Sequence, residues 1–260
     1  MITDASQRYG ILHFLQPAGS SKNASSIKMF RPADAMPMQP EVILFDVGNT
    51  LLFPNWQRIL APLTAKAIHP SHDQLQAIER QTKNEFDALV TSGKVDHGFW
   101  QLFYSHLLEL LQVQDNGMGP ALSEATRLSS NWDRIRPGTR EALDQIGGSF
   151  RIGVISNADG KIAEVLKACG ICDCFLSITD SGIVGHEKPH PAIFASALQT
   201  MGVAPERALY VGDVYAVDYV GAKNAGMQAI LFDVAGAYRG REWPRVESLQ
   251  ELQQRLKDGV

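Results

Sequence analysis

The amino-acid sequence predicts an α/β protein with a doubly wound parallel sheet into which an α-helical domain is inserted. Five short apolar runs have the length of buried strands: residues 42–45, 151–156, 174–179, 207–213 and 228–233. Amphipathic helical patterns lie between the later runs, and such alternation is typical of parallel sheets covered by helices. Residues 54–133 break the alternation, because they show helical periodicity without a strand signal.

These patterns predict a core built from residues 41–53 and 134–260, and a helical cap at 54–133. Residues 1–40 contain four prolines and a serine-rich stretch without an apolar period, so we expect a poorly ordered tail. Its best apolar run, residues 11–15, is shorter than the ~7–15 residues of a secretory signal. We predict a cytoplasmic protein, with organelle targeting by the tail left open.

Composition limits the classes of function. A chain of 260 residues exceeds the ~250 at which single cores stop growing, which allows a core and a smaller module. With 45% hydrophobic and 20% charged residues, no stretch approaches the ~18 apolar residues of a membrane span. The net charge of −4 shows no basic excess. We expect no membrane or nucleic-acid partner, and a monomer or a homodimer.

The three cysteines give no sign of a disulfide framework or a zinc site. They form one cluster at Cys169, Cys172 and Cys174, and an odd number cannot pair completely. A tetrahedral zinc site needs a fourth ligand, and none lies nearby at motif spacing. We therefore predict reduced, partly buried thiols, as in most cytosolic proteins.

The helical stretch contains two well-defined amphipathic helices. Ser71 with Gln74 forms a capping box, and Gly93 is placed to end that helix. The apolar residues of the first helix share one face: Leu75, Ile78, Thr82, Phe86 and Leu89. Those of the second recur at steps of three and four: Phe99, Leu102, Phe103, Leu107 and Leu110. Such faces predict a helical hairpin inside a small bundle.

The remaining helices follow the later strands. Helical patterns occupy residues 161–169, 191–201 and 217–225, between the apolar runs of the core. Val246, Leu249, Leu252 and Leu256 lie at helical spacing and predict a last helix that packs on the core.

Polar residues that close several strands are the candidates for chemistry, because open α/β sheets bind ligands beyond the carboxyl ends of their strands. These polar residues are Asp46 and Thr50 after the first run, Ser156 and Asn157 at the second, Lys188 before a helix, and Asp213 at the fourth; Gly48 lies between the first two and offers its backbone carbonyl. Asp46 and Asp213 provide hard oxygen ligands for Mg²⁺, and a lysine offsets their charge. A hydroxyl and an amide can bind phosphate oxygens, and a carboxylate can attack phosphorus.

A single aspartate that closes a strand is more often a cap or turn residue, so the joint order of the motifs matters. The motifs hydrophobic-Asp46-x-x-x-Thr50, hydrophobic-Ser156-Asn157, Lys188-Pro189 and Gly212-Asp213-(x)₄-Asp218 resemble, in order, the four motifs of the haloacid dehalogenase-like (HAD) superfamily. The resemblance covers about residues 41–235. More narrowly, these stretches resemble the haloacid dehalogenase-like hydrolase domain-containing protein three subgroup.

The resemblance implies a HAD-type Rossmann-like core and a set of roles. Asp46 would be the nucleophile and Lys188 the cation that bridges it to phosphate, with Thr50, Ser156 and Asn157 binding the phosphate. Mg²⁺ would be held by the side chains of Asp46, Asp213 and Asp218 and the carbonyl of Gly48. The helical stretch lies where many members of the superfamily carry a mobile cap that closes over the substrate. His97, Phe99 and Trp100 in this stretch, and Phe53, Asn55 and Trp56 after the first motif, are candidate substrate contacts. Packing is the more frequent role for the aromatic residues, and a solvated position in the first helical turn is the more frequent one for His97.

Gly48 departs from the superfamily's usual pattern. Most of its phosphatases carry a second aspartate at this position, which protonates the leaving group and then activates water. Loss of a positioned general acid–base typically lowers the rate by a factor of ~10²–10⁴. The sequence therefore predicts a Mg²⁺-dependent phosphatase for a small phosphorylated metabolite, with reduced or leaving-group-selective activity. The alternatives are a catalytically weak phosphate-binding relative and dehalogenase or phosphonatase chemistry, which needs no leaving-group proton.

Overall fold

The computed structural model describes residues 39–93 and 98–259, which lie in one compact unit, residues 37–260. Most of the predicted tail, residues 1–38, and the candidate contact His97 lie outside the described residues. Within the described part, no helix combines the length and the apolar character needed to cross a membrane.

The core is a parallel sheet of six strands in the order β5-β4-β1-β6-β7-β8, which confirms the predicted α/β fold. The strands are β1 (Val42–Phe45), β4 (Arg151–Ser156), β5 (Ser177–Asp180), β6 (Ala208–Gly212), β7 (Gln228–Phe232) and β8 (Arg245–Val246). Five follow the five apolar runs, whereas β8 was not predicted. The central strand β1 pairs with both β4 and β6, so the strand order reverses beside β1.

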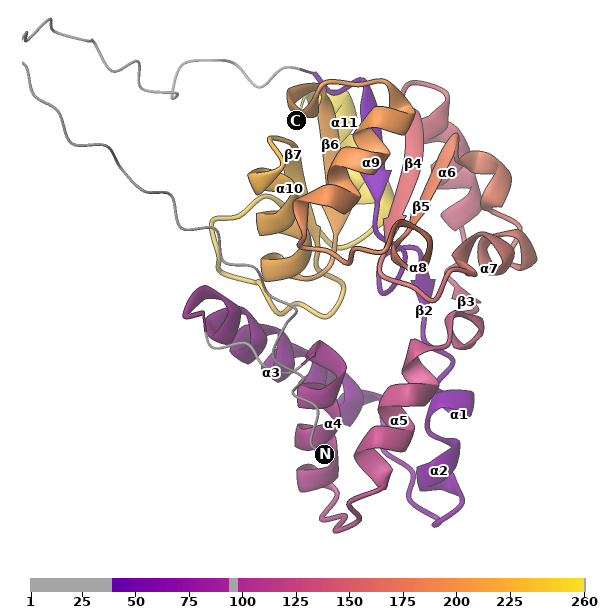
Figure 1. The fold of residues 1–260 in the computed structure, drawn as a ribbon, viewed down its shortest axis with the longest axis vertical. Coiled ribbons are helices and arrows are strands. Elements are labelled where there is room, and N and C mark those ends of the chain that lie inside the picture. Colours follow the sequence, from indigo (N-terminus) through magenta and orange to yellow (C-terminus); the bar gives the residue numbers. More distant parts are fainter. Residues whose placement is uncertain (1–38, 94–97, 260) are drawn as a thin grey trace, which may run out of the picture. The chain divides into compact units, whose positions relative to one another are not determined.

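Both faces of the sheet are buried, which explains the continuous apolar runs. Ile43 and Phe45 pack in one cluster with α6 (Thr139–Gly147), α7 (Ile162–Ala168) and α11 (Leu249–Asp258). Val42 and Leu44 point the other way, as successive strand residues must, into a cluster with helices α9 (Pro191–Met201) and α10 (Val220–Asn224). Figure 1 shows these two layers around the strands.

The helical insertion, residues 54–133, starts and ends at one small antiparallel pair of strands. β2 (Leu52–Phe53) pairs with β3 (Arg134–Ile135), and both are too short to give a strand signal in the sequence. Between them lie α1 (Trp56–Ile59), α2 (Ala61–Thr64), α3 (His72–Thr91), α4 (Phe99–Leu110) and α5 (Met118–Arg127). They share a cluster of buried side chains of their own, which includes Ile59, Leu75, Phe103 and Leu122.

Local signals set the ends of the long helix of the insertion. The predicted capping box of Ser71 and Gln74 is present at the start of α3, where each partner's side chain accepts from the other's backbone N–H. The helix ends at Thr91, and Gly93 adopts a positive φ of 69°, which a residue without a β-carbon adopts at little cost.

Four short helical turns, the first of them at the end of the insertion, and one wider turn complete the described part of the chain. The 3₁₀ turns are Ser129–Asn131, Cys172–Cys174 and Pro205–Arg207, and α8 covers Ser181–Val184. A π-helical turn, Tyr215–Tyr219, precedes α10, so the helix predicted from residue 217 starts earlier and with a wider turn.

Candidate active site

Four polar side chains named from the sequence meet beyond the carboxyl ends of β1, β4 and β6. Asp46 follows β1, Ser156 ends β4 and Asp213 follows β6. Lys188 lies in the loop before α9, and all four are buried. Asp46 and Asp213 therefore flank the point at which the strand order reverses, where open α/β sheets bind their ligands.

Lys188 is the centre of a buried hydrogen-bonded network. Its ammonium donates to Asp46 Oδ1 at 2.6 Å and to Asp218 Oδ1 at 2.7 Å. It also contacts the hydroxyl of Tyr210 at 2.8 Å, a β6 residue that the sequence analysis did not single out. Burial alone would lower the pKa of Lys188, but the carboxylates of Asp218 and Asp46 outweigh it and raise the pKa. The lysine is therefore a fixed positive charge beside Asp46.

The backbone after β6 turns Asp218 back toward the strand. Asp218 lies in the π-helical turn, and its Oδ2 accepts the N–H of Val214 at 2.9 Å. A β-carbon on Gly212 would stand only 2.5 Å from Asp218 Cγ, so glycine is required there for space. This close approach brings Asp218 beside Asp46 and Asp213.

Asp46, Asp213 and Asp218 form a buried group that fits a divalent cation. One carboxylate oxygen from each lies within 4.8 Å of the others. Burial raises the pKa of Asp46 to about 7, against the opposing effect of Lys188 and with a further rise from Asp218 and Asp213. Burial likewise raises the pKa of Asp213. Carboxylates crowded in this way are stabilised in their ionised form by a hard cation.

The residues expected to bind phosphate have different surroundings. Ser156 and Asn157 both line the cavity above the carboxylates. The side-chain amide of Asn157, however, is bonded to the backbone of Lys188, donating to its carbonyl at 3.0 Å and accepting from its N–H at 2.7 Å. Thr50 is buried, and no described residue hydrogen-bonds its hydroxyl. Asn157 thus fixes the loop that carries Lys188.

The cavity has a volume of about 660 Å³ and opens between the strand ends and the helical insertion. Its lining combines the carboxylates with aromatic side chains: Phe86, Phe99, Trp100 and Trp132. Phe99 and Trp100 are thus at the cavity, as the sequence allowed. Phe53, Asn55 and Trp56 are not among its lining residues. Trp56 instead stacks on Phe103 within the insertion, and Asn55 caps α1.

Trp132 occupies the space beside Gly48. A β-carbon at Gly48 would lie 3.3 Å from the indole ring, which is tighter than most real contacts. Gly48 has no positive φ, so space rather than backbone conformation favours glycine at this position. The indole N–H donates to the carbonyl of Thr126 at 2.8 Å and holds the ring there. The indole ring of Trp132 therefore occupies the space into which an acidic side chain at position 48 would extend.

A row of polar residues on α3 docks the insertion on the core, and the sequence analysis missed it. Lys83, 1% exposed, pairs with Asp213 Oδ2 at 2.8 Å and with Glu79 at 2.9 Å. Asp87 accepts the N–H of Ala216 and the hydroxyl of Tyr238, both at 2.9 Å. Glu79 and Lys83 are four residues apart, a spacing that usually marks a solvated helix face, so the sequence carried no signal for their burial.

Asp87 gives this interface a pH dependence. Burial raises the pKa of Asp87 from 3.8 to about 6, a rise worth roughly 3 kcal/mol. The folded protein thus holds the proton more tightly than the unfolded chain, and this contribution to stability is lost as pH rises from about 4 to 6. We expect Asp87→Asn to reduce the fall in melting temperature over that range, measured by calorimetry. An unchanged slope would contradict the assignment.

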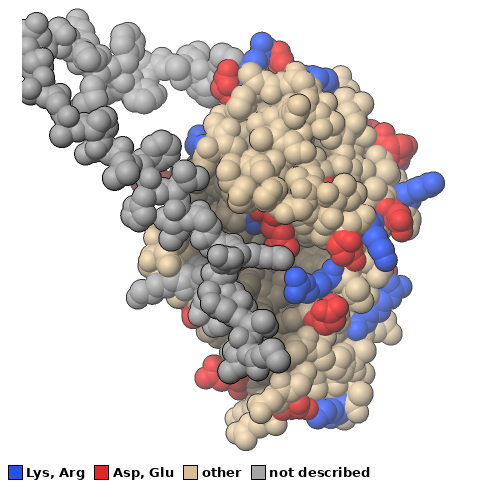
Figure 2. All heavy atoms as spheres, viewed as in Figure 1, with Lys and Arg blue, Asp and Glu red and all other residues tan. Residues whose placement is uncertain are grey.

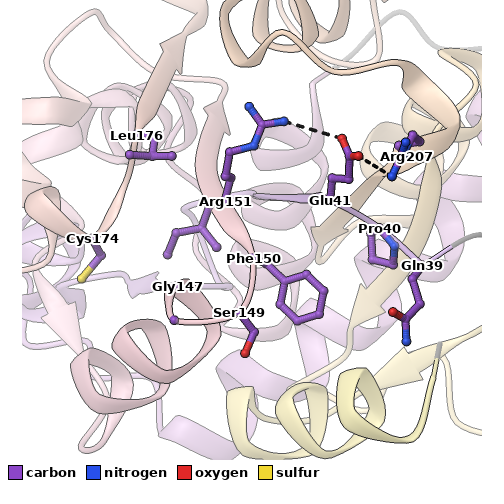
Figure 3. Close-up of a pocket in the computed structure, with 12 residues that line it drawn as sticks. Gln39, Pro40, Glu41, Gly147, Ser149, Phe150, Arg151, Cys174, Leu176 and Arg207 are labelled. Carbon is purple, nitrogen blue, oxygen red and sulfur yellow. Dashed lines mark ion pairs between the residues drawn. The ribbon is translucent and has the colours of Figure 1, made fainter.

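A second hollow, of about 890 Å³, lies at the opposite end of the strands. There Glu41 lies between Arg151 and Arg207 and pairs with both, as Figure 3 shows. Neither guanidinium is thus a free anion-binding group. On the face in Figure 2, basic and acidic side chains are interspersed. The catalytic candidates gather only at the first cavity among the described residues.

The four-motif order predicted a superfamily, and a family model tests that prediction. The model of haloacid dehalogenase-like hydrolases matches residues 40–226, which include Asp46, Ser156, Lys188, Asp213 and Asp218. The chain belongs to this hydrolase family. The resemblance inferred from the motifs is thereby confirmed.

Individual relatives agree with this assignment. The family member haloacid dehalogenase-like hydrolase domain-containing protein 3 from Homo sapiens is 37% identical over 212 residues, 75% of this chain and 82% of that protein. Glyceraldehyde 3-phosphate phosphatase from Methanothermobacter thermautotrophicus is 44% identical over 94 residues, 36% of this chain and 42% of that protein. The magnesium-bound HAD-hydrolase YfnB from Bacillus subtilis has the same fold, with 19% identity and a TM-score of 0.64, covering 84% of this chain and 99% of that one.

Proposed function

We propose that this hydrolase is a Mg²⁺-dependent phosphatase that acts on a small phosphorylated metabolite through an aspartyl-phosphate on Asp46. The observation that carries the proposal is the buried group of Asp46, Asp213 and Asp218, which also contacts Lys188. The partial similarity to glyceraldehyde 3-phosphate phosphatases and the magnesium in the related YfnB structure support it.

The residues suggest a two-step reaction. A carboxylate oxygen of Asp46 attacks phosphorus, the bond from phosphorus to the ester oxygen breaks, and that oxygen leaves with the electron pair. Water then attacks phosphorus, phosphate departs, and the Asp46 carboxylate is restored as the water proton passes to phosphate or solvent. Lys188 lowers the repulsion between the carboxylate and the phosphate throughout. Mg²⁺, held by the three carboxylates with the carbonyl of Gly48, would withdraw charge from the phosphate.

We infer that the helical insertion acts as a cap over this reaction. Its residues Phe99 and Trp100 line the cavity and Lys83 reaches Asp213, so the insertion contributes directly to the walls of the site. An apolar wall keeps bulk water away from the charged groups, which strengthens their interactions with the phosphate during its transfer to Asp46. Ser156 and the backbone around Asn157 are proposed to hold the phosphate oxygens, with Thr50 in support.

Gly48 selects the leaving group in this proposal. No carboxyl is present at this position to protonate the departing oxygen, and the ring of Trp132 crowds the place where one would extend. The aromatic walls of the cavity fit an apolar or aromatic leaving group. Aryl and acyl phosphates are therefore the proposed substrate types.

The test is hydrolysis of a panel of aryl, acyl and alkyl phosphates with Mg²⁺ and with excess chelator. We expect turnover of aryl and acyl phosphates with Mg²⁺, and loss of at least about 99% of it in chelator, because removing the cation leaves crowded carboxylates facing an anionic substrate. A 2-haloacid belongs in the same panel. Halide release in chelator would replace the proposal with dehalogenase chemistry, and a blank panel would replace it with a phosphate-binding role.

A further inference from the structure

The ammonium of Lys83 pairs with a carboxylate that the site can also offer to a divalent cation. It lies 2.8 Å from Asp213 Oδ2, and Asp213 is one of the three carboxylates that can share a metal ion. The ammonium of Lys188 already pairs with the other two carboxylates, Asp46 and Asp218. Lys83 is thus a second lysine in the site, and it comes from the insertion rather than from the core.

The Lys83 side chain is enclosed where α3 meets the core. It is 1% exposed and is also held by Glu79, one turn earlier on the same helix. One turn later, Asp87 binds the N–H of Ala216 and the hydroxyl of Tyr238. The contact of Lys83 with Asp213 is therefore part of the docking of α3 on the core.

The charged groups connected to Asp213 leave a net negative charge that a metal ion can balance. Among the described residues, the connected charged groups are Glu79, Lys83, Asp213, Asp46, Lys188 and Asp218. When ionised they sum to two negative charges, which one divalent cation neutralises. A cation at the carboxylates would nevertheless lie close to the Lys83 ammonium, and two positive charges repel strongly where water is excluded.

We propose that Lys83 and the divalent cation share Asp213, so that docking of α3 on the core sets the affinity of the site for Mg²⁺. Each cation weakens the hold of the other on this carboxylate. By reciprocity, Mg²⁺ loosens the docked α3 to the same degree that α3 weakens Mg²⁺. The inference rests on the proposed function only for the identity of the metal.

The experiment is calorimetric titration of the substrate-free protein with Mg²⁺, in wild type and in Lys83→Met. Methionine has a similar length without the charge, so the variant removes the competing cation and keeps most of the packing. We expect the Kd for Mg²⁺ to fall about tenfold or more in Lys83→Met. Lys83→Arg keeps the charge and is expected to stay close to wild type.

Arg80→Met is the matched control, because it removes a positive charge from the same docked face of α3. Arg80 donates to the carbonyl of Ala235 at 3.3 Å, a core contact away from the carboxylates. Its Kd for Mg²⁺ is expected to stay within about twofold of wild type. An equal fall in the Kd of both variants would overturn the assignment to Lys83, since it would reflect net charge alone.

Lys83→Met leaves Glu79 and Asp213 without their shared partner, which can prevent folding. The double variant Glu79→Gln with Lys83→Met removes one charge of each sign and serves as the second test, with folding checked by circular dichroism. It is expected to bind Mg²⁺ more tightly than wild type, though by less than the single variant. A Kd equal to or weaker than that of wild type in the folded variants overturns the proposal.

The same titration separates this inference from the proposed function. Binding of Mg²⁺ by Lys83→Met but not by wild type would support the shared carboxylate and overturn Mg²⁺ dependence of the native enzyme. Binding by neither would overturn both. Hydrogen exchange at the amide of Ala216, which donates to Asp87, gives a readout that is independent of binding heat. Mg²⁺ is expected to speed that exchange in wild type, and an unchanged or slower rate counts against the proposal.

Discussion

Replacement of Asp46 by Asn is expected to lower kcat/KM for an aryl phosphate at least about a thousandfold. An amide oxygen is a poor nucleophile, and the change also removes one of the three carboxylates of the metal group. The rate should be measured at saturating Mg²⁺, so that weaker metal binding does not account for the loss. A variant that keeps more than about a tenth of the activity has lost under ~1.4 kcal/mol, and Asp46 would not be the nucleophile.

Asp180→Asn is the matched control for this result. Asp180 is also a buried aspartate at the end of a core strand, but its carboxylate accepts backbone N–H groups from Gly160, Ile162 and Gly182. Its role is structural, so the variant should lose stability and keep most of its kcat/KM. A comparable loss of activity in both variants would mean that the assay reports unfolding.

Hydrolysis by the wild-type enzyme is expected to depend steeply on the pKa of the leaving group. An alkoxide needs a proton in the transition state, whereas a nitrophenolate or a carboxylate departs as the anion. Because Gly48 replaces the usual acid, kcat/KM should be lower for alkyl phosphates than for aryl phosphates by a factor of about 10²–10⁴. The measurement is a series of phosphates with graded leaving-group pKa. Comparable rates across the series would show that another group delivers the proton.

Gly48→Asp and Gly48→Asn together test the origin of that dependence. Both side chains press on Trp132, since even a β-carbon at this position lies 3.3 Å from the ring. Both variants should therefore melt at a lower temperature than wild type. Only the aspartate can donate a proton, so only Gly48→Asp should flatten the dependence on leaving-group pKa. Equal flattening in both would attribute the effect to displacement of Trp132.

The strand-end residues were predictable, because parallel strands of one sheet bring their carboxyl ends to the same edge. Asp46, Ser156 and Asp213 each close an apolar run, and the structure places them together with Lys188. The fold class followed from the same runs. Two-residue strands such as β2 and β3 contain too few residues for a period of two to be recognised.

Contacts between the insertion and the core were not predictable from local patterns. Lys83 has the spacing of a surface pair with Glu79, and its burial depends on where α3 meets the core. Trp132 and Gly48 are far apart in the sequence, and they meet because the insertion between them folds back to the core. The side-chain amide of Asn157 holds the Lys188 loop, a contact that the local sequence did not indicate, and its phosphate-binding role stays a prediction. The substrate, the cytoplasmic location and the oligomeric state stay predictions.

Because β2 pairs with β3, the segment between them can be replaced by another segment without changing the core strands. Phe53 is paired with Arg134, so the chain leaves the core and returns to it at neighbouring positions. Segments with adjacent ends can be lengthened, shortened or replaced at little entropic cost to the rest of the chain. The registers of β1 with β4 and β6 do not involve the insertion. Substrate preference can therefore diverge between relatives through this segment, while the strands that carry Asp46 and Asp213 stay unchanged.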